Sequence, residues 1–195
     1  MNKKSQFWET PTNEIRTEVI DNFLSDEEFE KIRFKIIGGV QESLDFVHQS
    51  IEWFYNESVA TDDISGDKNK YDFYMTHMIF SWPNGVNSSL YKDVMPIIEK
   101  LGPTSIIRIK ANLYPNQGTL REHQFHNDFL YPHQGAIFSI NTCDGYTLLD
   151  DGTKVASIAN RMLFLDASKP HASTTTSNTR TRININFNYH KFLKE

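Results

Sequence analysis

Apolar and polar residues alternate most regularly in the second half of the chain. Within the segment from Ile106 to Tyr114 apolar side chains occupy alternate positions, and residues 181–190, TRININFNYH, repeat the pattern. A period of two is that of a β-strand that buries one face. Further short strands are expected at 121–129, 135–141, 146–149, 154–158 and 161–166. The pattern therefore predicts that the second half is β-structure.

Helical signals are concentrated in the first half. Ser25 and Glu28 form the sequence pattern of a capping box, which begins a helix, and Gly38 with Gly39 ends it. Residues 88–101 carry a second helical stripe. The remaining segments of this half are read as strands at 14–24 and 73–81, as an undecided strand or helix at 44–55, and as a loop at 56–70.

Helices followed by many short strands indicate the α+β class. The predicted strands suffice to close a two-sheet jelly roll, with the N-terminal helices packed on the apolar face of one sheet. A length of 195 residues suits one domain, 1–195, and is enough to bury a hydrophobic core.

Charge and composition argue against several classes of function. The net charge is −5, so no broad attraction to nucleic acid or to an anionic membrane is expected. No apolar run approaches the roughly 18 residues that span a bilayer, and no apolar segment of a secretory signal follows the first lysines. Cys143 is the only cysteine, which fits a reducing compartment. We therefore expect a cytoplasmic protein without membrane or nucleic-acid partners, and its oligomeric state stays open.

The candidate chemistry begins with two residues that are one position apart. His126 and Asp128 lie in a predicted strand, so their side chains would leave the same face, and His171 follows later in the chain. Two imidazoles and one carboxylate can occupy one face of an Fe(II) ion and leave the opposite face open. The H-x-D pair alone is weak evidence in a chain with seven histidines, so its context must support it.

The polar face of the last strand supplies that context. Arg180 and Arg182 stand before a row of alternating asparagines. Such a face is either exposed to solvent or lines a wet ligand cavity inside a barrel, where an arginine would bind the far end of a dicarboxylate. Asn112 and Tyr114 offer an amide and a phenol to the same carboxylate.

Secondary candidates flank this set. His123 and His133 are read either as partners of the site or as surface histidines, and a zinc cluster of these two with His126 fits no common spacing. The loops 56–72 and 129–134 are expected to border the site. The acidic part of the first loop, 56–70, is either a solvated connection or a mobile lid.

Several segments resemble the Fe(II)/2-oxoglutarate-dependent oxygenase superfamily. Residues 114–128, YPNQGTLREHQFHND, are similar to the tyrosine–turn–H-x-D stretch of prolyl-4-hydroxylase-like members. NRMLFLD before His171 resembles the strand that leads to their distal histidine, and RININF resembles their last strand. VIDNFLSDEEFEKI resembles their N-terminal opening. The resemblance covers about the C-terminal half, and the compact size is similar to that of bacterial and phage-encoded members.

The resemblance implies a double-stranded β-helix whose metal and cosubstrate core spans about 104–190. The implied Fe(II) ligands and catalytic residues are His126, Asp128 and His171. The implied 2-oxoglutarate contacts are Arg182, its rival Arg180, Tyr114 and Asn112. Asn160 departs from the glycine that many relatives have at that turn, but asparagine tolerates the left-handed conformation.

The implied activity is a hydroxylation that consumes O2 and 2-oxoglutarate and releases succinate and CO2, with ascorbate as a candidate reductant. The carboxylate of Asp128 favours hydroxylation, since halogenating relatives lack it. The substrate stays open between a prolyl residue in a peptide, an amino acid and another small molecule. The alternatives are a jelly-roll binding module and a cupin-type metal protein without oxygenase activity.

Overall fold

Two antiparallel sheets form the body of the computed structural model, which describes residues 15–40, 47–48, 51–59 and 70–191. The strands of the larger sheet are β1 (Glu18–Ile20), β4 (Phe54–Asn56), β5 (Tyr74–Ser81), β6 (Gly85–Val86), β7 (Ser105–Pro115), β8 (Gln134–Ser139), β11 (Met162–Asp166) and β13 (Thr181–His190). Their order is β1-β11-β8-β13-β7-β5-β4, with β6 paired to β5. The smaller sheet has the order β10-β9-β12, from Lys154–Ala156, Tyr146–Leu149 and His171–Ala172.

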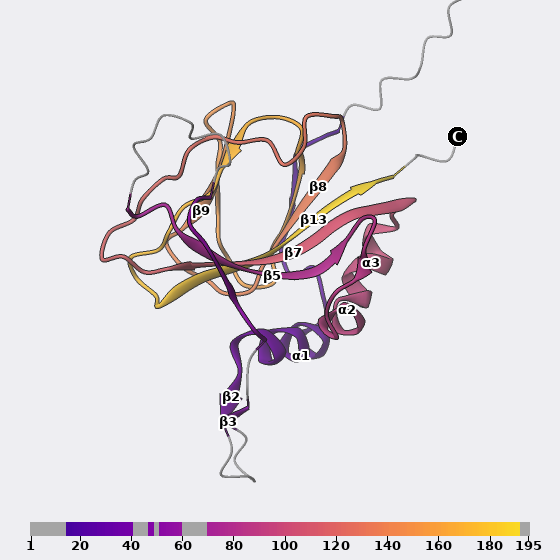
Figure 1. Cartoon of the computed structure of the whole chain (residues 1–195), viewed down its shortest axis with the longest axis horizontal. Helices are drawn as coiled ribbons and strands as arrows, with labels where there is room; N and C mark the ends of the chain where they lie inside the picture. The colour runs from indigo at the N-terminus through magenta and orange to yellow at the C-terminus, as the bar shows by residue number, and fades with distance from the viewer. Residues whose placement is uncertain (1–14, 41–46, 49–50, 60–69, 192–195) are drawn as a thin grey trace, which may run out of the picture.

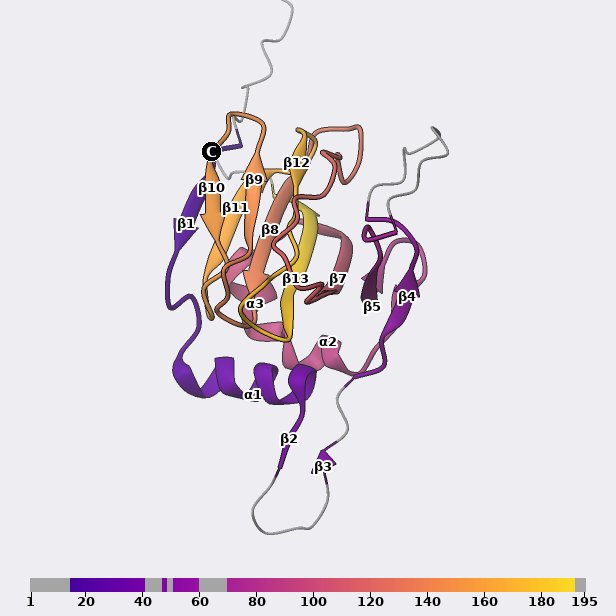
Figure 2. The same cartoon turned by 90° about the vertical axis from the view of Figure 1, so that its left-hand side faces the viewer.

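Three helices lie together on one side of the larger sheet (Figure 1). They are α1 (Asp26–Ile37), α2 (Leu90–Asp93) and α3 (Met95–Leu101). A small hairpin of β2 (Gly39–Val40) and β3 (Val47–His48) projects away from the sheets (Figure 2). The predicted α+β class and the jelly-roll core with helices on one sheet are confirmed.

Helix α1 begins where the sequence predicts. The hydroxyl of Ser25 accepts a hydrogen bond from the backbone N–H of Glu28, whose carboxylate accepts one from the backbone N–H of Ser25. These bonds satisfy donors that the first helical turn would otherwise leave free. The predicted helix at 88–101 is divided at Val94, because Pro96 has no N–H to continue the ladder and is tolerated only near the start of α3.

The apolar faces of β7 and β13 pack under the helices. Ile109 and Ile185 are fully buried in one core cluster with Ile32 and Ile36 of α1. Burial of each such side chain contributes about 1.5–3 kcal/mol. The opposite, polar face of β13 is therefore turned into the barrel, and Arg182 is only 1% exposed. The reading of this face as exposed to solvent is wrong.

Two predicted strands differ from the structure. The segment 121–129 is irregular and touches its neighbours through two isolated bridges, Glu122 to Thr174 and His126 to His171. The strand expected at 14–24 shortens to β1 at the edge of the sheet, where it pairs only with β11. Asn160 adopts the left-handed φ of 60° that its turn requires.

Part of the 44–55 segment and most of the proposed lid at 56–70 lie outside the described residues. Within the part of the chain that the structure describes, no helix is both long and apolar enough to cross a membrane.

Candidate active site

A reciprocal pair of backbone hydrogen bonds brings the two predicted metal-binding histidines together. The N–H of His126 donates to the carbonyl of His171 at 3.0 Å, and the N–H of His171 donates to the carbonyl of His126 at 3.0 Å. Residues paired in this way have Cα atoms about 5.5 Å apart and side chains on the same face. The imidazole centroids of the two residues are accordingly 4.8 Å apart.

Asp128 reaches the same place from an irregular segment. Its backbone N–H donates to the carbonyl of Ala167 at 3.0 Å, which fixes the chain beside the end of β11. One carboxylate oxygen of Asp128 lies 3.9 Å from Nε2 of His171. The candidate ligand atoms of His126, Asp128 and His171 all lie within 4.8 Å of one another, and this is the one such group that the described residues contain. Two imidazoles and one carboxylate at this separation suit Fe(II).

Three donors hold the carboxylate of Asp128. The guanidinium of Arg108 donates to Oδ1 at 2.5 Å, and the amides of Asn186 and Asn188 donate to Oδ2 at 2.9 and 2.8 Å. Burial alone would raise the pKa of Asp128, but Arg108, His171 and the two amides outweigh it and hold this pKa well below its usual range. The carboxylate is therefore charged and oriented before any ligand arrives.

Burial keeps His126 neutral. Burial and the neighbouring His171 together lower the pKa of this histidine to about 4, although Asp128 acts in the opposite direction. A neutral imidazole has a free lone pair, which is the form that binds a metal ion.

A small cavity lies beside the two histidines and extends to Thr147, a hydrogen-bond partner of Arg182. Its walls include Tyr114, His126, Thr147, His171 and Asn184. Arg182 donates to the carbonyl of Thr174 at 3.2 Å and to the hydroxyl of Thr147 at 3.0 Å. Its Nε is buried without a hydrogen-bond partner, and the described residues provide no carboxylate to pair with its guanidinium.

An unpaired buried guanidinium is a strong site for a carboxylate. The donors around this cavity therefore suit a dicarboxylate, with Arg182 as the partner of one carboxylate. The ring of Tyr114 lies 5.5 Å from that guanidinium, and the side-chain oxygen of Asn112 is buried without a partner, so both predicted contacts face the same cavity.

Arg180 lies elsewhere. It precedes β13, its side chain is exposed, and its carbonyl accepts a hydrogen bond from the backbone of Asn116 in the opposite turn. Two residues along a strand keep the same face, but β13 begins only at Thr181. The geometry thus favours Arg182 over Arg180 for a buried carboxylate.

Comparison with solved structures identifies the fold. A prolyl hydroxylase from Trichoplax adhaerens, in complex with a hypoxia inducible factor peptide fragment, matches with a TM-score of 0.59 at 14% identity, covering 91% of this chain and 84% of that one. An oxidoreductase of the 2OG-Fe(II) oxygenase family from Burkholderia pseudomallei matches with 0.55 at 10% identity, covering 89% and 84%. The chain has the fold of the 2-oxoglutarate/Fe(II) oxygenases.

A non-haem α-ketoglutarate-dependent epimerase from nogalamycin biosynthesis shares this oxygenase fold, with a TM-score of 0.55 at 11% identity over 91% of this chain and 77% of that one. No protein-family model and no curated protein matches the chain. At such low identities the likeness concerns the fold, and the roles of individual residues rest on the geometry given above.

The two secondary histidines are buried, so their reading as surface residues is wrong. His123 is 5% exposed and bonds the hydroxyl of Ser173 at 2.9 Å, and burial lowers its pKa to about 4. His133 is 1% exposed and contacts Asn188, which itself holds Asp128. Among the described residues they form no metal cluster with His126.

Sequence reasoning missed the residues that hold Asp128. Arg108 and the asparagines stand on the polar faces of the alternating strands β7 and β13, so the alternation itself was the available signal. The register that sets Arg108 opposite Asn188, and both against Asp128, is a tertiary property.

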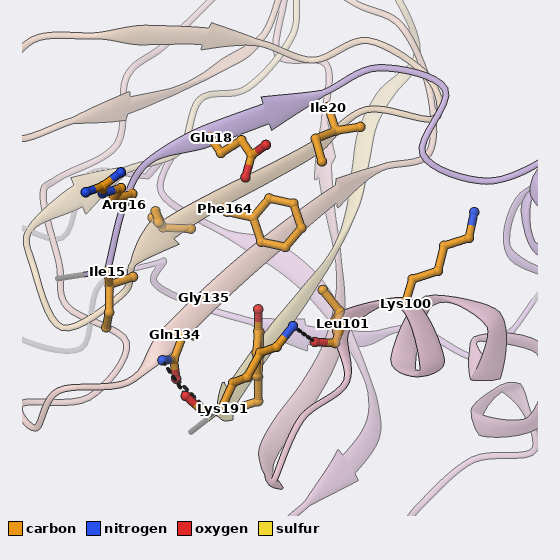
Figure 3. Close-up of a pocket in the computed structure, with 12 residues that line it drawn as sticks. Ile15, Arg16, Glu18, Ile20, Lys100, Leu101, Gln134, Gly135, Phe164 and Lys191 are labelled. Carbon is orange, nitrogen blue, oxygen red and sulfur yellow. Dashed lines mark hydrogen bonds between the residues drawn. The ribbon is translucent and has the colours of Figure 1, made fainter. Parts of the chain in front are cut away.

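A larger hollow lies away from this site, on the other face of the sheet. Phe164, Leu101 and Lys191 line it, and Lys191 donates to the carbonyl of Leu101 at 2.6 Å (Figure 3). It contains none of the predicted ligands. The size of a hollow alone therefore does not identify the candidate active site of this molecule.

Proposed function

We propose that this protein is a non-haem Fe(II)- and 2-oxoglutarate-dependent dioxygenase that hydroxylates a peptide or small-molecule substrate and releases succinate and CO2. The observation that carries the proposal is the lining of one cavity. His126 and His171 of the preformed His126, Asp128 and His171 group line it on one side, and Thr147, to which the guanidinium of Arg182 donates, lines it on another. The oxygenase fold and the sequence resemblance support it.

Each residue then has a distinct task. His126, Asp128 and His171 would hold Fe(II) through neutral imidazoles and one charged carboxylate. Arg182 would bind the distal carboxylate of 2-oxoglutarate, with Tyr114 alongside. When bound, Fe(II) would activate O2 with electrons from 2-oxoglutarate, so that one oxygen atom enters succinate and the other converts a C–H bond of the substrate into a hydroxyl group.

The protein's own contribution is orientation and charge. Arg108 and the amides of Asn186 and Asn188 fix the carboxylate of Asp128, so that its orientation does not change when a metal binds. The polar inner face of β13 excludes bulk water while it satisfies the polar groups of the ligands. We also propose that 1–195 is one oxygenase domain and that it works in the cytoplasm.

The first test is spectroscopic and needs no substrate. Anaerobic addition of Fe(II) and 2-oxoglutarate is expected to give a weak visible charge-transfer band, which a binding module or a cupin-type protein would not give. The band should be lost in Asp128→Ala and retained in Asp150→Ala, a matched change at an exposed position.

The second test is turnover with ascorbate present. Asp128→Ala is expected to abolish succinate release, while circular dichroism shows a retained fold. Asp128→Asn keeps an oxygen for Arg108 and controls for the loss of that contact. Succinate release by Asp128→Ala at the normal rate would contradict the assignment of Asp128.

A further inference from the structure

A second cation lies beside the metal centre and forms no ion pair with a carboxylate of the described residues. Lys110 stands opposite Asn186 in the register of β7 and β13, and Asn186 donates to Asp128. The side chain of Lys110 therefore shares the inner face of the barrel with the group that holds the metal-binding carboxylate. It is only partly exposed.

The one hydrogen-bond partner of Lys110 within the described residues is a neutral phenol. Its ammonium donates to the hydroxyl oxygen of Tyr74 at 3.2 Å and lies 5.3 Å from the centroid of that ring. Burial raises the pKa of Tyr74, so the phenol carries no charge to balance the ammonium. Burial and Arg108 together lower the pKa of Lys110 to about 8, although the charge of Asp128 acts in the opposite direction.

The phenol of Tyr74 can add a second donor. Its oxygen accepts from Lys110, and no described residue accepts the hydroxyl hydrogen. The ring of Tyr74 stacks on Tyr114 at 5.6 Å, and Tyr114 lines the cosubstrate cavity. The ammonium and the phenol thus offer two donors to the two oxygens of one carboxylate, at the border of that cavity.

A count of charges shows why a further anion is needed. Arg108 is paired with Asp128 at 2.5 Å. Under the proposed function Arg108, Lys110, Arg182 and Fe(II) would bring five positive charges, whereas Asp128 and 2-oxoglutarate would bring three negative ones, so two positive charges remain. The ammonium of Lys110 remains uncompensated in a partly buried place, which costs free energy unless a ligand brings a negative charge.

We propose that Lys110, together with Tyr74, binds a carboxylate of the primary substrate, so that the substrate is a carboxylic acid with its acidic group close to the carbon that is oxidised. This inference rests on the proposed function and names its substrate class. Lys110 is a specificity residue in it.

The first experiment compares stability without substrate. Lys110→Met keeps the length of the side chain and removes its charge, and Lys92→Met makes the same change at an exposed position of α2. In the protein loaded with Mn(II) and 2-oxoglutarate, the Tm of Lys110→Met should equal or exceed that of the wild type, because an uncompensated cation is removed. A Tm several degrees below that of Lys92→Met would show a structural role and overturn the proposal.

The second experiment measures the preference for an acid. N-acetyl-proline, N-acetyl-leucine and N-acetyl-phenylalanine are each tested against their primary amides, by Tm shift with Mn(II) and by succinate release with Fe(II). Wild type and Lys110→Arg should favour the acids by about tenfold or more, and Lys110→Met should lose this preference. Equal effects of acids and amides, a preference that survives Lys110→Met, or no effect of any acid would overturn the proposal.

A control distinguishes failure of the proposed role of Lys110 from failure of the proposed dioxygenase function. The anaerobic Fe(II) and 2-oxoglutarate band needs no primary substrate. A normal band without an acid preference removes only the role of Lys110, whereas a missing band removes the proposed function. Lys110→Met should need the same 2-oxoglutarate concentration as the wild type to develop the band. A rise as large as that in Arg182→Met would assign Lys110 to the cosubstrate and overturn the proposal.

Discussion

The ion pair between Arg108 and Asp128 is the contact of the candidate metal centre whose removal has the clearest consequence. Arg108→Met takes away the cation and keeps much of the side-chain volume. The carboxylate of Asp128 has a side chain only 5% exposed, and it would keep just the amides of Asn186 and Asn188. We expect the metal-free protein to lose stability, because a buried charge is left partly uncompensated.

The size of the loss follows from burial. Removal of one partner of a buried pair typically costs about 3–5 kcal/mol. The side chain of Arg108 is 19% exposed and two amides remain on Asp128, so we expect the lower end, about 3 kcal/mol. For a chain of this length that corresponds to a fall in Tm of roughly 6–12 °C.

The pH dependence gives this loss a signature. In the wild type the folded pKa of Asp128 is depressed, so its contribution is present above the unfolded value and is lost only in strong acid, as the pH falls through the folded pKa. Without Arg108 only His171 and the two amides oppose the effect of burial, so we expect the pKa of Asp128 to rise. In Arg108→Met the buried carboxylate of Asp128 then becomes protonated as the pH falls. The difference in unfolding free energy between the wild type and the variant should therefore narrow from pH 7 to pH 4.

Urea denaturation in EDTA at both pH values measures this difference in unfolding free energy. Added Mn(II) then tests whether a bound metal ion reduces it. A divalent ion supplies the missing positive charge, so Mn(II) should raise the Tm of Arg108→Met more than that of the wild type. Arg161→Met is the control, since its ion pair with the half-exposed Asp21 is screened by solvent and should contribute much less to stability. A loss in Arg108→Met no larger than in this control, or a gap unchanged by pH and metal, would refute the reasoning.

Three further predictions concern the cavity. Arg182→Met should raise the 2-oxoglutarate concentration for half-maximal binding by roughly 10–150-fold, whereas Arg180→Met should change it less than about twofold; the opposite ranking would transfer the role to Arg180. Gly145→Ala should cost about 1–3 kcal/mol in urea denaturation, since the new Cβ would lie 2.6 Å from both Cδ of Arg182 and the carbonyl oxygen of Thr175; an unchanged midpoint would show that these atoms can shift. Burial lowers the pKa of His123 in the folded protein to about 4, so the unfolding free energy of the wild type should fall from pH 6.5 to pH 4, by up to about 1.4 kcal/mol per pH unit for this residue. His123→Gln should reduce this pH dependence, and the same slope in both proteins would exclude a contribution from His123.

Local patterns predicted the parts of the fold that local physics decides. The capping box of Ser25 and Glu28 and the alternation in β7 and β13 are set by neighbouring residues, and the structure agrees with both. The segment 121–129 was misread because its order comes from single bridges to distant strands rather than from its own period. His126 and Asp128 nevertheless meet His171, because the reciprocal backbone pair does what a regular strand was expected to do.

The register of the sheet explains why three cations on the same alternating faces have different partners. Arg108, Lys110 and Arg182 all project from the inner face of the barrel, and among the described residues only Arg108 of these three forms an ion pair with a carboxylate. Arg182 is held by neutral oxygens and Lys110 by a neutral phenol, so each can exchange a weak contact for a strong one when an anion arrives. If all three cations were paired with carboxylates of the chain, none of them would be available to bind an anionic ligand. The two cations without counter-ions thus mark where ligands are expected, and the paired one marks where the protein prepares its own carboxylate.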